Sequence, residues 1–214
     1  MAQTPARPRT HSGPGRPAAS NSEETRLRIL EAAQICFGDY GYKATSNRVV
    51  AEHAGVTAGT IYHYFTDKQH LFLSAHKAIQ AEVLETVNAA IEGQDRFSDA
   101  VQALIDALLA VHLKHPSYAK FNSAVRTEAI RNPEISDALV DLEWRTLYQN
   151  LTELGITTGE IRRSDARMVR HVLSLTILGI THVGIELNST DFAECMRGLG
   201  RLYDKTLVAP PTKG

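Results

Sequence analysis

Cysteine is scarce in this 214-residue sequence, which contains only Cys36 and Cys195. The two residues lie far apart, and neither belongs to a C-x-x-C pair, so the sequence indicates no disulfide framework and no zinc knuckle. Each stands within a helical pattern of apolar residues, and we expect both to be small buried side chains.

Patterns that would indicate secretion, strands or catalysis are also missing. The N-terminus lacks the apolar core of a signal peptide. No segment after Gly93 shows the alternation typical of a strand. There is no nucleophile elbow, no phosphate-cradling glycine loop and no pair of catalytic carboxylates. We therefore predict an all-α cytoplasmic protein that is not an enzyme and needs no cofactor.

Histidine is the one abundant metal-ligating residue, with nine in the chain. His112 and His115 stand three apart, and His70 and His76 stand six apart, whereas ligands on one helix face commonly stand four apart. Neither pair has a cysteine near it in sequence. A metal sensor is therefore a disfavoured alternative, and we predict no metal site.

The charges are distributed unevenly, although the formal net charge is −1. Residues 1–77 contain nine Lys and Arg against six Asp and Glu, and the remainder contains 14 against 18. A basic N-terminal part joined to a mildly acidic remainder is typical of a DNA-binding head on a body that does not bind DNA.

The segment from Asn47 to Thr66 has the pattern of a helix-turn-helix. Val50 and Ala54 are four residues apart and so share one face of a short helix. Gly55 suits the left-handed residue that ends such a helix. Thr57 suits the N-cap of a second helix, on which Ile61 and Tyr64 or Phe65 would pack back on the first.

The outward face of the second helix is suited to a DNA duplex. Its small residues allow close approach, and its polar and aromatic groups can reach bases or phosphates. Arg48 lies on the polar side of the first helix, and Lys68 lies in the first turn of the next helix. There, a cation opposes the helix dipole unless a phosphate lies beside it. A tight helix pair without DNA is the alternative. The candidate DNA contacts are Arg48, Thr57, Ala58, Gly59, Thr60, Tyr62, His63 and Lys68.

The run from Glu23 to Leu71 resembles the N-terminal domain of the TetR family of bacterial transcriptional regulators. The matching segments are TRLRILEAA, FGDYGYKATS and VAEHAGVTAGTIYHYFTDKQHLF, about a quarter of the chain. The resemblance implies that Thr45 and Ser46 are phosphate contacts. It also implies a homodimer that reads a near-palindromic operator on the nucleoid, repression as the usual mode, and release by a small molecule bound in the second domain.

Four regions are expected along the chain. Residues 1–22 form a basic arm, residues 23–70 the DNA-binding domain, residues 71–208 the effector-binding and dimerisation domain, and residues 209–214 a tail. The arm is either a flexible leader or a minor-groove contact through Arg7, Arg9 and Arg16. A long helix from about Asp67 to Ile91 would cross from head to body and act as a lever.

Further helices are predicted throughout the second domain. Their expected ranges are 95–115, 117–131, one continuous helix over 132–154 that Gly155 ends, 164–187, and a last helix that Thr190 caps and that ends near Val208.

The segment from Val172 to Leu187 is apolar nearly all round. It is shorter than the ~20 residues of a membrane span and contains His182 and Glu186, so we predict no membrane. Such a helix must be covered on every side. A homodimer through this helix and the last one is the prediction, and the buried central helix of a monomer is the alternative.

The effector site is predicted from mid-helix residues that carry polar atoms or aromatic rings. These residues suggest a largely hydrophobic ligand with a few polar handles. For each one the alternative is an ordinary core or surface side chain, and a regulator without any effector stays open. The candidates are His112, Tyr118, Phe121, Trp144, Tyr148, His171 and His182.

Overall fold

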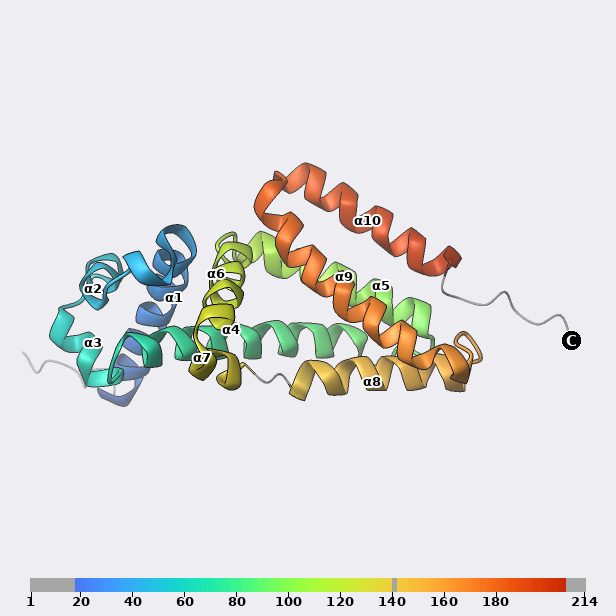
Figure 1. Ribbon diagram of the computed structural model, residues 1–214, viewed down its shortest axis with the longest axis horizontal. Helices are drawn as coiled ribbons and strands as arrows, with labels where there is room; N and C mark the ends of the chain where they lie inside the picture. Colours follow the sequence, from blue (N-terminus) through green and yellow to red (C-terminus); the bar gives the residue numbers. More distant parts are fainter. Residues whose placement is uncertain (1–17, 140–141, 207–214) are drawn as a thin grey trace, which may run out of the picture.

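The computed structural model describes residues 18–139 and 142–206, and all regular structure in those ranges is helical. The predicted all-α fold is confirmed. Three helices, α1 (Ala18–Ala44), α2 (Asn47–Ala54) and α3 (Ala58–Tyr64), form the head at one end. Helix α4 (Lys68–Ile91) runs lengthwise from the head into the body (Figure 1), as the lever helix was predicted to do.

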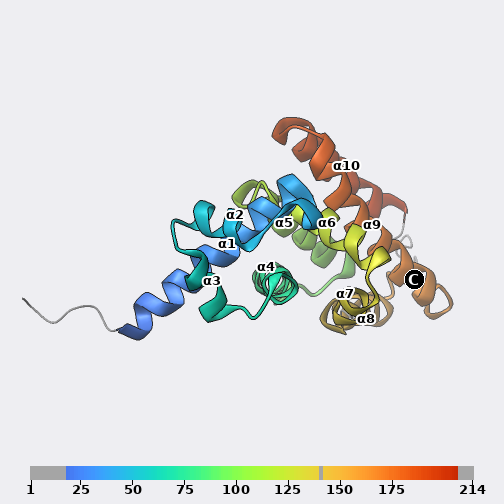
Figure 2. The ribbon, with the colours of Figure 1, turned by 60° about the vertical axis from the view of Figure 1, so that its left-hand side comes forward.

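The body surrounds the far part of α4. It consists of α5 (Phe97–Lys114), α6 (Tyr118–Arg131), α7 (Pro133–Ala138), α8 (Leu142–Thr157), α9 (Ala166–Glu186) and α10 (Ser189–Thr206), with a short 3-10 turn at Arg163–Asp165 before α9. Figure 2 looks almost along α4 and shows the head, α5 with α6, and α7 with α8 on different sides of it.

Helix α1 begins earlier than predicted. It starts at Ala18 and so includes the last five residues of the predicted arm over residues 1–22. The three arginines of the arm and the tail 209–214 lie outside the described residues.

The prediction of one continuous helix over 132–154 is wrong. Asn132 does cap a helix, since its side chain accepts the N–H of Glu134, but that helix ends at Ala138 and α8 begins at Leu142. Gly155 does not end α8 either. It is buried inside the helix, where the absence of a side chain lets Ile161 pack against its backbone. The turn comes at Gly159, which has a positive φ of 77°.

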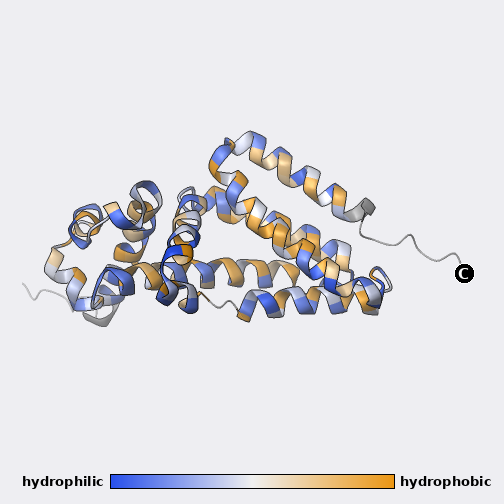
Figure 3. Cartoon of the chain, viewed as in Figure 1, coloured by the Kyte–Doolittle hydropathy of each residue, from blue (hydrophilic) through white to orange (hydrophobic). Residues whose placement is uncertain are grey.

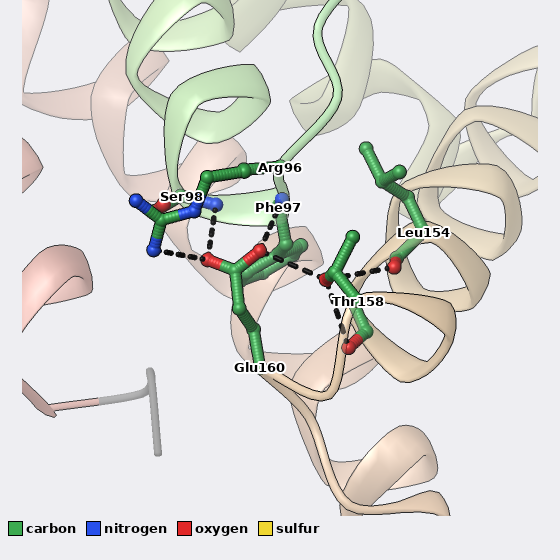
Figure 4. Close-up of polar contacts among 7 residues, drawn as sticks. Arg96, Phe97, Ser98, Leu154, Thr158 and Glu160 are labelled. Carbon is green, nitrogen blue, oxygen red and sulfur yellow. Dashed lines mark hydrogen bonds and ion pairs between the residues drawn. The ribbon is translucent and has the colours of Figure 1, made fainter. Parts of the chain in front are cut away.

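Glu160 supplies the N-terminal cap of α5 from a distant part of the chain. Arg96, at the N-cap position, makes no side-chain cap hydrogen bond. Instead, Glu160 Oε1 accepts the Phe97 N–H at 2.8 Å and Oε2 accepts the Ser98 N–H at 3.2 Å (Figure 4). Burial alone raises the pKa of Glu160, but these bonds and that from Thr158 lower it overall. The carboxylate therefore satisfies donors that a helix start leaves unpaired.

Helices α9 and α10 leave a large apolar surface uncovered. Within the described part of the chain, Arg163–Glu186 is the one stretch long and apolar enough to cross a membrane, yet only 22% of its most apolar window is buried. Figure 3 shows the apolar character of α9. Met168, Leu175 and Leu202 are 53%, 68% and 62% exposed. One such helix is weak evidence for a membrane, and a partner molecule could equally cover it.

Two smaller predictions also change. Asn188, rather than Thr190, caps α10, because its side-chain oxygen accepts the N–H groups of Thr190 and Asp191 at 3.0 Å. Cys36 is buried as expected, and burial raises the pKa of its thiol. Cys195 is exposed, because it falls on the outer side of α10.

Candidate nucleic-acid interface and effector cavity

The turn between α2 and α3 is built by local hydrogen bonds. Gly55 adopts the left-handed conformation, with φ 66° and ψ 36°, and its N–H and that of Val56 donate to carbonyls of the last turn of α2. Thr57 caps α3 by accepting the Thr60 N–H at 3.1 Å. Val50 and Ile61 are fully buried beneath the turn. The predicted helix-turn-helix geometry is therefore present.

The predicted recognition face is open to solvent. Thr57, Gly59, Tyr62 and His63 are exposed, with Tyr62 at 60%, and Ala58 and Thr60 are half-buried. The Thr57 and Thr60 hydroxyls lie 2.9 Å apart and share a hydrogen bond at the start of the helix. Arg48 is exposed on α2. These residues are available to a duplex, and their contacts with DNA stay a prediction.

A surface groove of about 370 Å³ gathers residues from the starts of α2 and α4 and from α3. It contains the predicted Thr45, Ser46, Tyr62 and Lys68. Lys43, Asn47 and Thr66 also line it and were not predicted, although each lies within two residues of a predicted position. Asn47 is 7% exposed, and its Oδ1 has no hydrogen-bond partner. Two lysines and the N-termini of α2 and α4, against the one carboxylate of Asp67, make this groove suitable for a phosphate group.

The expected phosphate contact of Thr45 does not fit its surroundings. Its side chain is 1% exposed, and its hydroxyl lies 2.8 Å from the Gly41 carbonyl oxygen and 3.0 Å from that of Cys36. Its N–H also donates to Gly41. Both of its donors are thus engaged inside the head, and we assign Thr45 to positioning the start of α2. Ser46 is exposed, and its side-chain oxygen accepts the Val49 N–H at the start of α2; its contact with a phosphate stays a prediction.

Lys68 is held against the head rather than extended into solvent. Its Nζ donates to the Tyr42 carbonyl oxygen at 3.0 Å and lies 4.4 Å from the centre of the Tyr42 ring. Asp67, beside it, caps α4 by accepting the His70 N–H at 2.7 Å, and that bond holds the pKa of Asp67 below its usual value. An ammonium group has three donors, so Lys68 can also bind a phosphate from this position.

A second cavity, of about 410 Å³, lies in the body between α4, α6, α8 and α9 and is open to solvent on one side. It brings together three of the predicted ligand residues, Tyr118, Trp144 and Tyr148. Its other described apolar lining residues are Leu139, Ile177 and Leu178, and its polar ones are Gln80, Asn122, Arg126, Ser136, Arg145, Ser174 and Thr181. The helical spacing of Tyr118, Asn122 and Arg126 was visible in the sequence and would have found two of them.

A polar chain links the cavity wall to the middle of α4. The Trp144 Nε1–H donates to Gln80 Oε1 at 3.2 Å, and Gln80 Nε2 donates to His76 Nε2 at 3.1 Å. The pKa of His76 is lowered to about 4, mainly by burial and also by the charge of Arg126, while the interaction of the ring with the Asn122 side chain opposes the shift. His76 is therefore neutral at pH 7, and its Nε2 accepts a hydrogen bond from the Gln80 amide.

The other four predicted ligand residues lie elsewhere. Phe121 is fully buried between the head and the body, and His112 packs on Phe192 with ring centroids 4.1 Å apart. His171 is exposed, and His182 is exposed with its Nε2 3.5 Å from Glu186. His112 belongs to α5, which does not line the cavity, and the other three residues lie on faces of α6 and α9 that do not line it.

Comparison with known proteins agrees with this geometry. Residues 29–75 match the family model described as bacterial regulatory proteins, tetR family. The uncharacterized regulator YhgD of Bacillus subtilis is 29% identical over 157 residues, which are 71% of this chain and 80% of YhgD. The transcriptional repressor AcnR of Corynebacterium diphtheriae is 38% identical over 73 residues, but that match spans only 33% of this chain and 38% of AcnR.

The whole fold has counterparts among solved structures. The regulator FadR of Bacillus subtilis, solved in complex with stearoyl-CoA, superimposes with a TM-score of 0.73 at 21% identity, over 86% of this chain and 97% of FadR. An identity this low shows a common fold alone. Together with the family match on the head and its helix-turn-helix geometry, it leads to one conclusion: the chain belongs to the TetR family and is a DNA-binding transcriptional regulator.

Proposed function

We propose that the protein is a homodimeric repressor that binds a near-palindromic operator and leaves it when a small ligand enters the body. The exposed face of α3 and the cationic groove beside it support operator binding. In a dimer with a two-fold axis, each head would bind one half-site, and the two half-sites would be related by the same two-fold axis. Repression is the usual mode of the family, and the relatives named AcnR are repressors.

The uncovered face of α9 and α10 supports the homodimer. A soluble protein rarely exposes a contiguous apolar patch of this kind without a partner. Gly179 and Gly198, one on each helix, have no neighbouring atom within 4 Å of where a Cβ would lie. Close approach of a second copy at these glycines would bury the exposed leucines of both helices.

The observation that supports release by a ligand is that α6 contacts both the cavity and the head. On one face it lines the cavity through Tyr118, Asn122 and Arg126. On the other face Phe121 stacks on Phe37 of α1, and Lys120 Nζ lies 2.8 Å from Asp39 Oδ1 of the head. A shift of α6 on ligand binding would therefore move the head directly. FadR, which shares this fold, was solved in complex with stearoyl-CoA, so a protein of this fold can hold a ligand.

The cavity changes the kind of ligand that we propose. Polar side chains outnumber apolar ones in its described lining, so an amphiphilic molecule fits it better than a largely hydrophobic one. A regulator without an effector is the alternative, and the open cavity argues against it. We also keep the division into a head over residues 23–70 and a body over residues 71–208 as a proposal, with the head extended back to Ala18.

Binding of the purified protein to DNA upstream of its own coding sequence tests this function. We expect a dimer to bind one such site, with affinity that falls as salt rises, and a small amphiphilic compound to release it. A monomer that binds DNA, or binding that no compound alters although the cavity is shown to be occupied, would contradict the proposal. Random DNA of the same length is the control.

A further inference from the structure

The charge of the body cavity is one-sided. Arg126 from α6 and Arg145 from α8 both line it, and no Asp, Glu or Lys does so among the described residues. His76, which accepts a hydrogen bond from the cavity-lining Gln80, adds no charge because it is neutral. Within the described residues, the cavity therefore presents two positive charges and no lining carboxylate.

Neither arginine is neutralised by a neighbour that the structure describes. The ion pairs of the described residues involve other cations, such as Lys120 with Asp39 and Arg163 with Glu153. Both Arg126 and Arg145 belong to the exposed class, whereas Tyr118 and Trp144 are each only 6% exposed. The guanidinium groups thus stand toward the mouth of the cavity, and the aromatic walls lie deeper.

Asn122 is a second and independent indication of a ligand. It lines the same cavity and is 3% exposed, and its Oδ1 has no partner within normal hydrogen-bond geometry, although the side chain interacts with His76 closely enough to raise the pKa of that ring. A buried acceptor without a donor costs free energy, so a molecule that brings an O–H or N–H to this point is favoured. Asn122 lies one helical turn from Arg126, which places the acceptor and the cation on the same wall.

We infer that the cavity binds an organic carboxylate whose charged end meets Arg126 and Arg145 and whose apolar or aromatic body lies against Trp144. The body of the ligand carries a hydroxyl that donates to Asn122 Oδ1. Guanidinium groups recognise carboxylates through paired charge-assisted hydrogen bonds. A volume of about 410 Å³ is within the range of small-molecule sites. This inference rests on the proposed ligand control and names the class of ligand.

The chain contains its own probe, because Trp144 is the single tryptophan and it lines the cavity. We would titrate the full-length protein with 3-(4-hydroxyphenyl)propanoate and follow tryptophan fluorescence. The neutral amide of the same acid tests the charge, and 3-phenylpropanoate tests the hydroxyl. We expect the acid to bind about tenfold more tightly than the amide, and the hydroxyl to contribute about threefold.

Three variants assign the effect to residues. Arg126→Gln and Arg145→Gln should each weaken acid binding about tenfold and leave amide binding unchanged. Arg167→Gln is the matched control, because Arg167 is an exposed arginine of α9 that does not line the cavity. Asn122→Leu should abolish the preference for the hydroxylated acid while keeping the preference for acid over amide.

The outcomes separate this inference from the proposed function. Equal binding of acid and amide would overturn the anion assignment while leaving a ligand-binding regulator. Failure of both carboxylates to change the fluorescence at millimolar concentration would also overturn it. Operator binding and release are measured separately on DNA, so their failure would contradict the repressor and not the carboxylate site.

Discussion

Phe37 of α1 and Phe121 of α6 are both fully buried, and their rings stack with centroids 6.4 Å apart. Phe72 of α4 stands edge-on to both, at 4.9 Å from Phe37 and 5.6 Å from Phe121. One aromatic cluster therefore joins the first helix of the head, the connecting helix and the helix that lines the cavity. Phe121 belongs to the mechanical link between the two parts.

Truncating Phe121 should weaken that link strongly. Phe121→Ala should lower the free energy of unfolding by about 3–5 kcal/mol, because it removes a buried ring and leaves a cavity. Ile130→Ala, in the same helix at 87% exposure, should change it by less than about 0.5 kcal/mol. Urea unfolding at one fixed protomer concentration measures both. Equal effects of the two substitutions would contradict the buried position of Phe121.

His76 should make stability depend on pH. Its folded pKa of about 4 lies below its ordinary value of 6.5, so between these values the unfolded chain binds a proton that the folded protein does not. Above pH 6.5 the imidazole is neutral in both states, and as the pH falls below 6.5 the free energy of unfolding decreases because only the unfolded chain takes up the proton. The expected loss from pH 6.5 to pH 5 is about 2 kcal/mol.

The variant His76→Gln should remove this part of the pH dependence. Urea unfolding at the two pH values would show a smaller loss for His76→Gln than for the unmodified protein. The control is His171→Gln, since His171 is exposed on α9. An identical pH dependence in all three proteins would show that His76 titrates normally in the fold.

The features that sequence reasoning found are local ones. The turn at Gly55 and the cap at Thr57 depend on residues within a few positions of each other, so their side chains alone indicate the geometry. The same holds for the cap at Asn132. The long helix α4 was predictable because its apolar stripe has one period from Leu71 to Val87.

The features that sequence reasoning missed depend on contacts between distant segments. Glu160 caps a helix that begins 63 residues earlier, and nothing near Arg96 in sequence indicates it. Gly155 was expected to end a helix, but packing of Ile161 keeps it inside α8. Thr45 was expected to contact a phosphate, yet it is 1% exposed and its hydroxyl donates to the Gly41 carbonyl oxygen. The cavity likewise depends on the rotation of four helices, which periodicity leaves undetermined.

Gly59 tests the recognition helix separately from stability. A Cβ at this position would meet only Thr57 Oγ1, at 3.7 Å, which is an ordinary contact. Gly59→Ala should therefore raise the free energy of unfolding by about 0.5–1 kcal/mol, yet weaken operator binding because its methyl group stands where the duplex approaches. Thermal unfolding and DNA titration measure the two effects. Unchanged DNA binding would remove Gly59 from the interface.

Leu175 tests the proposed dimer. It is 68% exposed on α9, whereas Leu178, three residues on, lines the cavity and would confuse the result. Leu175→Glu should give a monomer of 23.5 kDa that binds the operator poorly, because a buried unpaired charge opposes association. Leu113→Glu, an exposed position on α5, is the control. A Leu175→Glu dimer in light scattering would contradict the proposed interface.

Lys68 tests the cationic groove. Its ammonium group is positioned by the Tyr42 carbonyl at the start of α4, where a bound phosphate would also meet the positive end of the helix dipole. Lys68→Ala should weaken binding to operator and random DNA alike and reduce the slope of log affinity against log salt by about one. Lys114→Ala removes an equally charged lysine from the body, where Lys114 pairs with Glu82, and should leave the slope unchanged. If Lys68→Ala kept the full slope, the groove would not be a phosphate site, and its lysines would serve only to hold α4 against the head.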